Sequence, residues 1–230
     1  EPSNTHIFPA GGRRGTTVRV LVGGECIPPD TGFRIWGDGL SAPAVLGSKR
    51  LANVEPSPRR DPRETPISYP KEWQSTIEVG DEAPMGAVMW RLTCARGGTG
   101  TRPFIVGDLP EFIETESNSL PERAERVELP VTINGRIAGE SDLDYFMFHA
   151  AAGEVVIIDV VAARLGSPFD PVVKITEAAG RRIAAEELHV GSDPVLAFRA
   201  PASGDYRLLV SNVSFHGSPA HVYRVTLTTV

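Results

Sequence analysis

Short stretches in which hydrophobic and polar residues alternate recur along the whole chain. Thr16–Val22 places Val18, Val20 and Val22 on one face of a strand and the intervening side chains on the other. Similar stretches recur every 8–12 residues or so, a spacing typical of β-sandwiches and barrels. Strands are predicted at 16–22, 33–36, 74–79, 86–94, 127–131, 144–149, 155–161, 195–198, 206–210 and 222–227.

One segment has conflicting signals. Ile175–Leu188 is rich in helix-forming residues, and propensity alone favours a helix. However, Gly180 separates a strand-like run at 172–177 from a second short run at 182–185. We therefore predict a β-hairpin whose turn is 179–181.

The composition supports many short strands and two units. The chain has 23 Gly and 20 Pro in 230 residues, which favours turns over long helices. Prolines crowd the stretch 55–70, which we interpret as an extended loop. Up to Gly107 the net charge is +2, and from Asp108 onward it is −8. We place the boundary there, with domains at 1–107 and 108–230.

Several function classes are disfavoured. The overall net charge is −6, so a basic nucleic-acid footprint is missing from the totals. No apolar run approaches the roughly 20 residues that a membrane span needs. Glycine-rich nucleotide loops, zinc motifs with paired histidines and the nucleophile elbow of hydrolases are also missing, and we expect no enzyme.

The two cysteines allow two interpretations. Cys26 and Cys94 both lie in strand-like stretches, so a disulfide could join two strands of the first domain. Both could equally be buried free thiols. The first residue is Glu1 rather than Met, which favours a trimmed or processed chain and, with an even cysteine count, a secreted protein.

Acidic residues follow the proposed boundary. Glu114, Glu116 and Asn118 alternate, so an extended segment would place them on one face, and Asp142 and Asp144 alternate likewise. If the two segments meet, their oxygens match the ligands that calcium prefers. The competing interpretation is a solvated acidic linker with Asp142 in a turn.

Aromatic residues of the first domain suggest a second kind of site. Tyr69 and Trp73 flank the end of the proline-rich stretch and, if exposed and coplanar, could bind a carbohydrate. Trp90 lies in an apolar strand and is predicted to be core. Burial of Tyr69 and Trp73 would remove this interpretation.

Particular motifs in the second half resemble a known family. They are 114–118 (ETESN), 141–146 (SDLDYF), 152–154 (AGE) and 200–208 (APASGDYRL). In this order and spacing they are similar to the bacterial pre-peptidase C-terminal domain. The connecting segment 102–111 resembles large secreted proteins of planctomycete-type bacteria, in which such a domain follows an immunoglobulin-like or TIG-like domain. Residues 8–18 resemble that preceding domain loosely.

The resemblance has implications for fold, location and ligands. It implies a jelly-roll β-sandwich that is exported and associated with secreted enzymes without being catalytic. It also maps Glu114, Glu116, Asn118 and Asp144 onto calcium-ligand positions of collagenase-associated relatives. Two departures weaken this mapping, because Ser117 replaces a usual Pro and Ser119 stands where Asp or Asn is common.

Together these observations predict an all-β protein with an immunoglobulin-like sandwich followed by a jelly-roll-like sandwich. The expected role is a non-catalytic binding or assembly module, secreted or at a bacterial cell surface, with a calcium site and extracellular protein or polysaccharide partners. A carbohydrate-binding module is one alternative. A structural spacer or filament subunit that self-assembles is the other.

Overall fold

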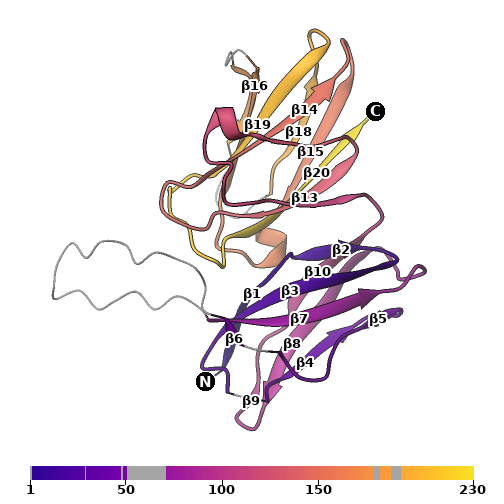
Figure 1. The fold of residues 1–230 in the computed structure, drawn as a ribbon, viewed down its shortest axis with the longest axis vertical. Coiled ribbons are helices and arrows are strands. Elements are labelled where there is room, and N and C mark those ends of the chain that lie inside the picture. Colours follow the sequence, from indigo (N-terminus) through magenta and orange to yellow (C-terminus); the bar gives the residue numbers. More distant parts are fainter. Residues whose placement is uncertain (1, 29, 48, 51–70, 179–181, 188–192) are drawn as a thin grey trace, which may run out of the picture.

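The protein is almost entirely β-structure. The computed structural model describes residues 2–28, 30–47, 49–50, 71–178, 182–187 and 193–230. Four five-stranded sheets pack as two successive sandwiches (Figure 1). The prediction of two β-sandwiches is confirmed. Among the described residues, no helix has the length and apolar character that crossing a membrane would need.

The first sandwich contains the strands up to Gly107. One sheet has the order β1-β3-β7-β5 with β6 paired to β7, and the opposing sheet has the order β2-β10-β8-β4 with β9 paired to β8. The strands are β1 (Ser3–Phe8), β2 (Gly11–Arg13), β3 (Thr16–Glu25), β4 (Gly32–Trp36), β5 (Leu40–Ser41), β6 (Lys49–Arg50), β7 (Lys71–Val79), β8 (Gly86–Cys94), β9 (Gly97–Gly98) and β10 (Arg102–Gly107).

The second sandwich begins at Glu111. Its sheets have the orders β11-β13-β20-β15-β18 and β12-β14-β19-β16-β17. The elements are β11 (Glu111–Ile113), η1 (Pro121–Arg123), β12 (Glu125–Arg126), β13 (Val131–Arg136), β14 (Leu143–Ala150), β15 (Val155–Val161), η2 (Ala163–Leu165), β16 (Pro171–Glu177), β17 (Arg182–Glu187), β18 (Val195–Arg199), β19 (Gly204–Asn212) and β20 (Val222–Thr229).

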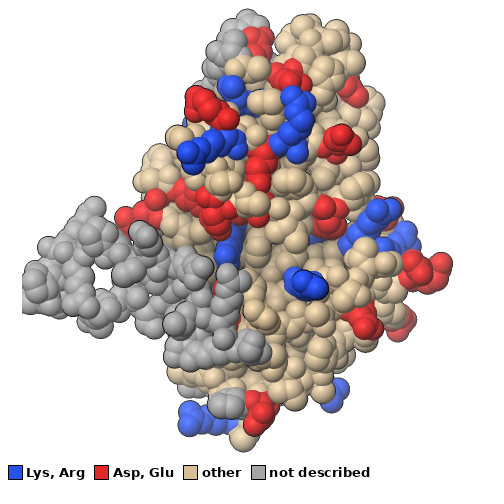
Figure 2. Space-filling view, in the orientation of Figure 1, with Lys and Arg blue, Asp and Glu red and all other residues tan. Residues whose placement is uncertain are grey.

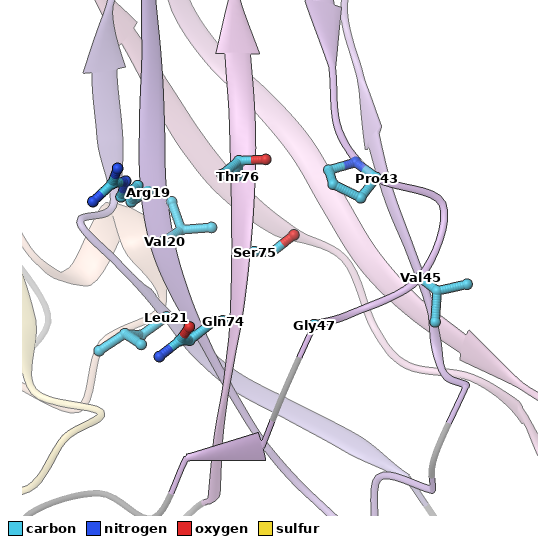
Figure 3. A pocket seen from close by; sticks show the side chains of 9 residues that line it. All are labelled: Arg19, Val20, Leu21, Pro43, Val45, Gly47, Gln74, Ser75 and Thr76. Atoms are coloured by element: carbon cyan, nitrogen blue, oxygen red, sulfur yellow. The ribbon is translucent and has the colours of Figure 1, made fainter.

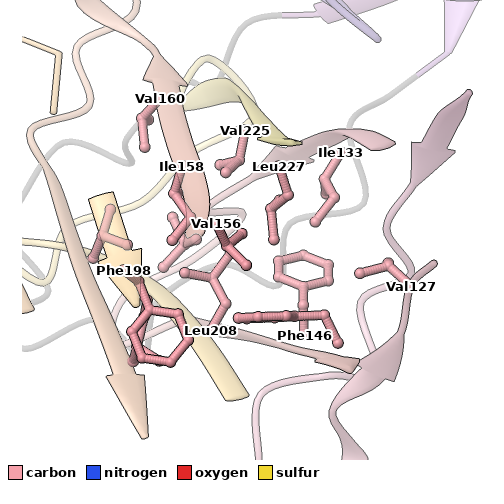
Figure 4. Packing of buried hydrophobic residues seen from close by; sticks show 14 of the residues in the cluster. Val127, Ile133, Phe146, Val156, Ile158, Val160, Phe198, Leu208, Val225 and Leu227 are labelled. Carbon is pink, nitrogen blue, oxygen red and sulfur yellow. The ribbon is translucent and has the colours of Figure 1, made fainter. Parts of the chain in front are cut away.

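Alternation along the strands builds the core of the second sandwich. Phe146 of β14 points inward and faces Val156 and Ile158 of β15 across the sandwich (Figure 4). Phe148 of β14 belongs to the same core cluster. All four side chains are fully buried. Because successive side chains of a strand point to opposite faces, the intervening residues of each strand lie toward the surface.

The two sandwiches share apolar contacts at their junction. Leu165 of η2 and Val222 of β20 belong to the second sandwich, yet both are buried in the core cluster of the first. Figure 1 shows η2 as a short orange turn lying between the two sandwiches. The core cluster of the first sandwich therefore includes residues that the second sandwich contributes.

Polar contacts also cross the junction. Nη1 of Arg136 in β13 lies 3.0 Å from Oε1 of Glu72 in β7, and the same carboxylate oxygen lies 2.9 Å from Nε2 of His6. His6 and Glu72 are almost completely buried. The Arg136 guanidinium also lies over the Phe8 ring, 4.9 Å from its centroid. Burial lowers the pKa of His6, so at neutral pH Arg136 supplies the positive charge next to Glu72.

The hairpin prediction is confirmed, whereas one strand was misplaced. β16 and β17 pair in antiparallel orientation, with the predicted turn 179–181 outside the described residues. The strand predicted at 127–131 is wrong, because this segment connects β12 to β13. Pro130 has no N–H to donate to a ladder, and pairing starts only at Val131.

Of the two interpretations of the cysteines, the disulfide is not formed in this structure, and the thiols are not fully buried either. Cys26 and Cys94 are both free thiols in this structure. Cys26 follows the end of β3 and is exposed, and Cys94 ends β8 in the opposing sheet. Since the Cys26 side chain faces solvent instead of the space between the sheets, the two sulfur atoms do not meet.

Candidate functional site

A buried cluster of polar residues lies between the two sheets of the second sandwich. The hydroxyl of Tyr223 in β20 is 3.0 Å from Oε2 of Glu114 and 2.6 Å from Oδ2 of Asp144 in β14. Oε1 of Glu114 accepts a hydrogen bond from the backbone N–H of Arg136 at 2.5 Å. All three side chains of the Glu114–Tyr223–Asp144 cluster are buried. We call this arrangement, with Glu116, Asn118 and Asp142, the acidic site.

Asp142 and Glu116 of the acidic site make further polar contacts. Asp142 Oδ1 accepts a hydrogen bond from Ser119 at 3.1 Å, and Oδ2 accepts one from the backbone N–H of Ala138 at 2.8 Å. Glu116 Oε1 lies 3.3 Å from Nε of Arg136. Figure 2 shows Asp and Glu side chains gathered on the second sandwich where it approaches the first.

The segment that carries Glu114, Glu116 and Asn118 is not an extended strand, which corrects the sequence expectation. After β11 ends at Ile113, the backbone turns at 116–117 and Ser117 N–H bonds to the Thr115 carbonyl at 2.7 Å. Asn118 is nevertheless anchored beside Asp144, because its carbonyl accepts a hydrogen bond from Tyr145 N–H. The predicted residues meet through a turn, and Ser and Asn are common turn residues.

Burial and mutual repulsion raise the pKa values of the carboxyl groups. Burial is the largest cause for both Glu114 and Asp144, and repulsion between neighbouring carboxylates adds to it. The pKa of Glu116 is also raised, first by burial and then by Asp142, against the opposing effect of Arg136. The pKa of Tyr223 is raised for the same two reasons, so its hydroxyl stays protonated. Without a cation, the acidic site favours retention of a proton between Glu114 and Asp144.

The acidic site offers ligands suited to a calcium ion. Calcium takes about 6–8 oxygen ligands, and carboxylates, an amide oxygen and a hydroxyl are all present here. Asn118 is buried and its Oδ1 has no hydrogen-bond partner. Such an orphaned acceptor costs free energy unless a donor or cation meets it. Among the described residues, no three acidic, His or Cys side chains already converge in a metal-binding geometry, so a bound ion requires rotation of these side chains.

Two members of this arrangement were missed in the sequence. Tyr223 lies in a closing strand that the hydrophobic pattern assigns to the core, and its hydroxyl role depends on pairing between β13 and β20. Arg136 ends β13 and connects the acidic site with Glu72 of the first sandwich. Neither residue belongs to a local motif, so only the three-dimensional register reveals them.

Trp73 does not offer the exposed ring that the predicted aromatic platform requires. Trp73 is 6% exposed and belongs to the core of the first sandwich, while Tyr69 lies outside the described residues. Trp73 sits on β7 with its side chain on the inward face, together with Ile77 and Val79. Trp73 therefore presents no surface for a sugar ring.

Two hollows on the described surface do not gather catalytic groups. One of about 630 Å³ lies beside β7 and is lined by residues of β3, β7 and the segment 43–47, with no acidic or histidine side chain (Figure 3). Another of about 550 Å³ lies between the sandwiches, and Glu111 is its one acidic lining residue. Neither brings together the nucleophile, base and orienting group that a hydrolase needs.

Comparisons with known proteins give limited similarity. No family model matches the chain. About half of the chain is similar to a pre-peptidase C-terminal domain. That domain belongs to a collagenase from Bacillus anthracis, with 20% identity, a TM-score of 0.36, and coverage of 49% of this chain and 100% of that one.

Two further similarities involve larger proteins. A probable subtilase-type serine protease of Deinococcus radiodurans is 35% identical over 72 residues, which are 31% of this chain and 10% of that protein. The matched segment thus spans about a tenth of that relative's length. SGBP-B of a Bacteroides ovatus mixed-linkage glucan utilization locus, in complex with a heptasaccharide, is 10% identical over 96% of this chain and 71% of its own, with a TM-score of 0.24. The TIG-like assignment of residues 1–107 stays a prediction.

Proposed function

We propose that this chain is a non-catalytic extracellular module for binding or assembly, whose second sandwich is stabilised by calcium. One observation carries the calcium part: Glu114, Tyr223 and Asp144 form a buried cluster beside Asn118, whose buried Oδ1 has no partner. A divalent cation would neutralise the clustered carboxylates and satisfy that oxygen. Glu114, Glu116, Asn118, Asp142 and Asp144 are the residues we expect to hold it.

We further propose that 1–107 and 108–230 are the two domains. The strands of the first two sheets all end by Gly107, and those of the other two begin at Glu111. A calcium site at the start of the second domain would fix the connecting segment against β14. Extracellular calcium modules bind with dissociation constants of about 10⁻⁴–10⁻³ M, which suits a protein outside the cell.

Calcium is expected to stabilise the protein against thermal unfolding. At 100 times its dissociation constant, a ligand that binds only the folded state adds about 2.7 kcal/mol. For a chain of this size, each kcal/mol raises the melting temperature by about 2–4 °C. The measurement is thermal unfolding by circular dichroism, in millimolar calcium and in chelator.

The control variants locate the effect. Glu116→Ala and Asn118→Leu should abolish the calcium-dependent shift, whereas Glu122→Ala, an exposed acid on η1, should retain it. Magnesium should give a smaller shift, because it demands a tighter octahedral set of ligands. An equal shift in all three variants, or none in the unmodified protein, contradicts the proposal.

The calcium effect should grow with pH. The folded-state pKa values of Glu114 and Asp144 are raised, so their contribution to metal-free stability is full below the unfolded values of about 4. It is lost as pH rises through the folded values. Calcium needs the ionised carboxylates, so the melting-temperature difference between calcium and chelator should be larger at pH 8 than at pH 5.

A variant isolates this dependence from other titrations. Burial lowers the pKa values of His6 and His221, and these groups make stability rise with pH below about 6.5. Asp144→Asn keeps both histidines but should remove most of the pH dependence of the calcium shift. A calcium shift of the same size at pH 5 and pH 8 in the unmodified protein would count against the acidic site.

A further inference from the structure

An exposed apolar row crosses the outer face of the first sandwich. Trp36 of β4 is 41% exposed, and Met89 of β8 is 39% exposed. The strand register places Trp36 opposite Met89, and Met89 opposite Pro103 of β10. Side chains directly opposite on neighbouring strands are in contact distance, so these three residues form a row across three strands. Large exposed aromatic side chains in such rows mark interaction surfaces.

Two arginines flank this row and face one another. Arg34 of β4 lies opposite Arg91 of β8. Arg34 is two residues before Trp36 in the strand, so both side chains are on the same face. The Arg91 guanidinium lies over the Trp36 ring, 5.4 Å from its centroid. Within the described chain, neither Arg34 nor Arg91 has an ion-pair partner, and the buried Nε of Arg91 has no hydrogen-bond acceptor.

The register of Arg34 and Arg91 places two positively charged residues on one face of neighbouring strands. Like charges directly opposite on neighbouring strands repel each other. By contrast, Arg136, Arg164 and Arg224 each meet a carboxylate. The positive charge on the Trp36 face is thus complementary to a negatively charged partner.

The face consists of outward-pointing side chains of β4 and β8. β4 and β8 lie at the part of the first sandwich that is remote from the second (Figure 1). The hollows described above are lined by other residues, so a ligand here would lie across the strands and not enter a pocket. A long ligand with repeated units suits such a surface, since several weak contacts add together.

We propose that the face formed by Arg34, Trp36, Met89 and Arg91 binds an acidic polysaccharide built of uronate units. The part of the Trp36 ring that Arg91 leaves uncovered offers a rigid apolar surface for the C–H face of a pyranose. The guanidinium groups of Arg34 and Arg91 provide forked donors that match a carboxylate. This inference rests on the proposed binding role, but it is independent of the calcium site.

Trp36 provides its own reporter of binding. The chain has three tryptophans, and Trp73 and Trp90 are buried. Quenching of the intrinsic fluorescence by acrylamide therefore reports mainly on Trp36. Soluble oligogalacturonates, titrated in low-calcium buffer, should protect Trp36 from quenching in a saturable manner. A neutral glucan of matched length should not, and added salt should weaken the protection.

Substitutions test the position of the surface. Trp36→Ala and Arg34→Gln should each weaken binding about tenfold or more. Binding of Trp36→Ala is measured by affinity electrophoresis in a gel that contains the uronate polymer, and binding of Arg34→Gln by fluorescence quenching. Phe215→Ala changes an exposed aromatic residue of the second sandwich and should bind as the unmodified protein does. Each variant should keep the far-ultraviolet circular dichroism spectrum and the cooperative thermal transition of the unmodified protein, which shows that it folds.

Specific results would overturn the inference. No protection by oligogalacturonate, equal affinity for the neutral glucan, or an equal loss in Phe215→Ala would each do so. Equal protection by polyglutamate would replace the polysaccharide by an acidic polypeptide and overturn the ligand class. None of these results would alter the calcium shift, so failure here is distinguishable from failure of the calcium proposal.

Discussion

Replacing Arg136 by Met is expected to lower the free energy of unfolding by about 3–5 kcal/mol, the range for removing one partner of a buried ion pair. The side chain of Glu72 is 1% exposed and lies 3.0 Å from Nη1 of Arg136. Methionine keeps much of the apolar stem that covers Phe8 but removes the positive charge. The buried carboxylate then loses the positive charge of Arg136, while its hydrogen bond with His6 remains.

Chemical denaturation measures this loss, and two further variants interpret it. Glu72→Gln combined with Arg136→Met removes both charges and should recover a large part of the stability. Arg126→Met breaks an ion pair on the exposed surface, between Arg126 and Asp205, and should change the unfolding midpoint little. If Arg136→Met and Arg126→Met behave alike, the junction ion pair has no stabilising role.

Replacing Leu165 by Ala is expected to cost about 2–5 kcal/mol, the range for truncating a buried leucine. Leu165 is 4% exposed and lies in the core cluster of the first sandwich, although η2 belongs to the second. The truncation therefore leaves a cavity between the two sandwiches. We expect the unmodified protein to unfold in one transition, and Leu165→Ala to separate the unfolding of the two halves.

Differential scanning calorimetry shows whether one or two transitions occur. Leu120→Ala truncates a leucine of the second sandwich that is 51% exposed, and it should preserve the single transition. Two well-separated transitions in the unmodified protein would mean that Leu165 does not couple the halves.

Alternation predicted the strands that carry a regular apolar face. β8 and β15 have the predicted bounds, and β3 extends the predicted one by three residues. β1 was missed, because Asn4 and His6 occupy buried positions where a hydrophobic pattern expects apolar residues. Their burial depends on partners distant in sequence, such as Gly100 and Glu72, which no local pattern can reveal.

The acidic site was partly predictable and the aromatic site was not. Spacing identified Glu114 and Asp144, but their convergence on Tyr223 requires three strands to be placed together. For Trp73 the proline-rich stretch before it suggested exposure. In the structure β7 already begins at Lys71, so the strand's alternation turns Trp73 inward. Trp36, by contrast, lies on a strand whose outer face stays uncovered.

The shared junction also determines the relative orientation of the two sandwiches. Leu165 and Val222 are enclosed by the first sandwich, and Arg136 ties β13 to β7 beside them. We expect these contacts to limit motion between the sandwiches, so that the chain behaves as one rigid unit and not as two flexibly linked domains. A polymer bound to β4 and β8 would then keep a constant distance and orientation relative to β14 and β19 of the second sandwich.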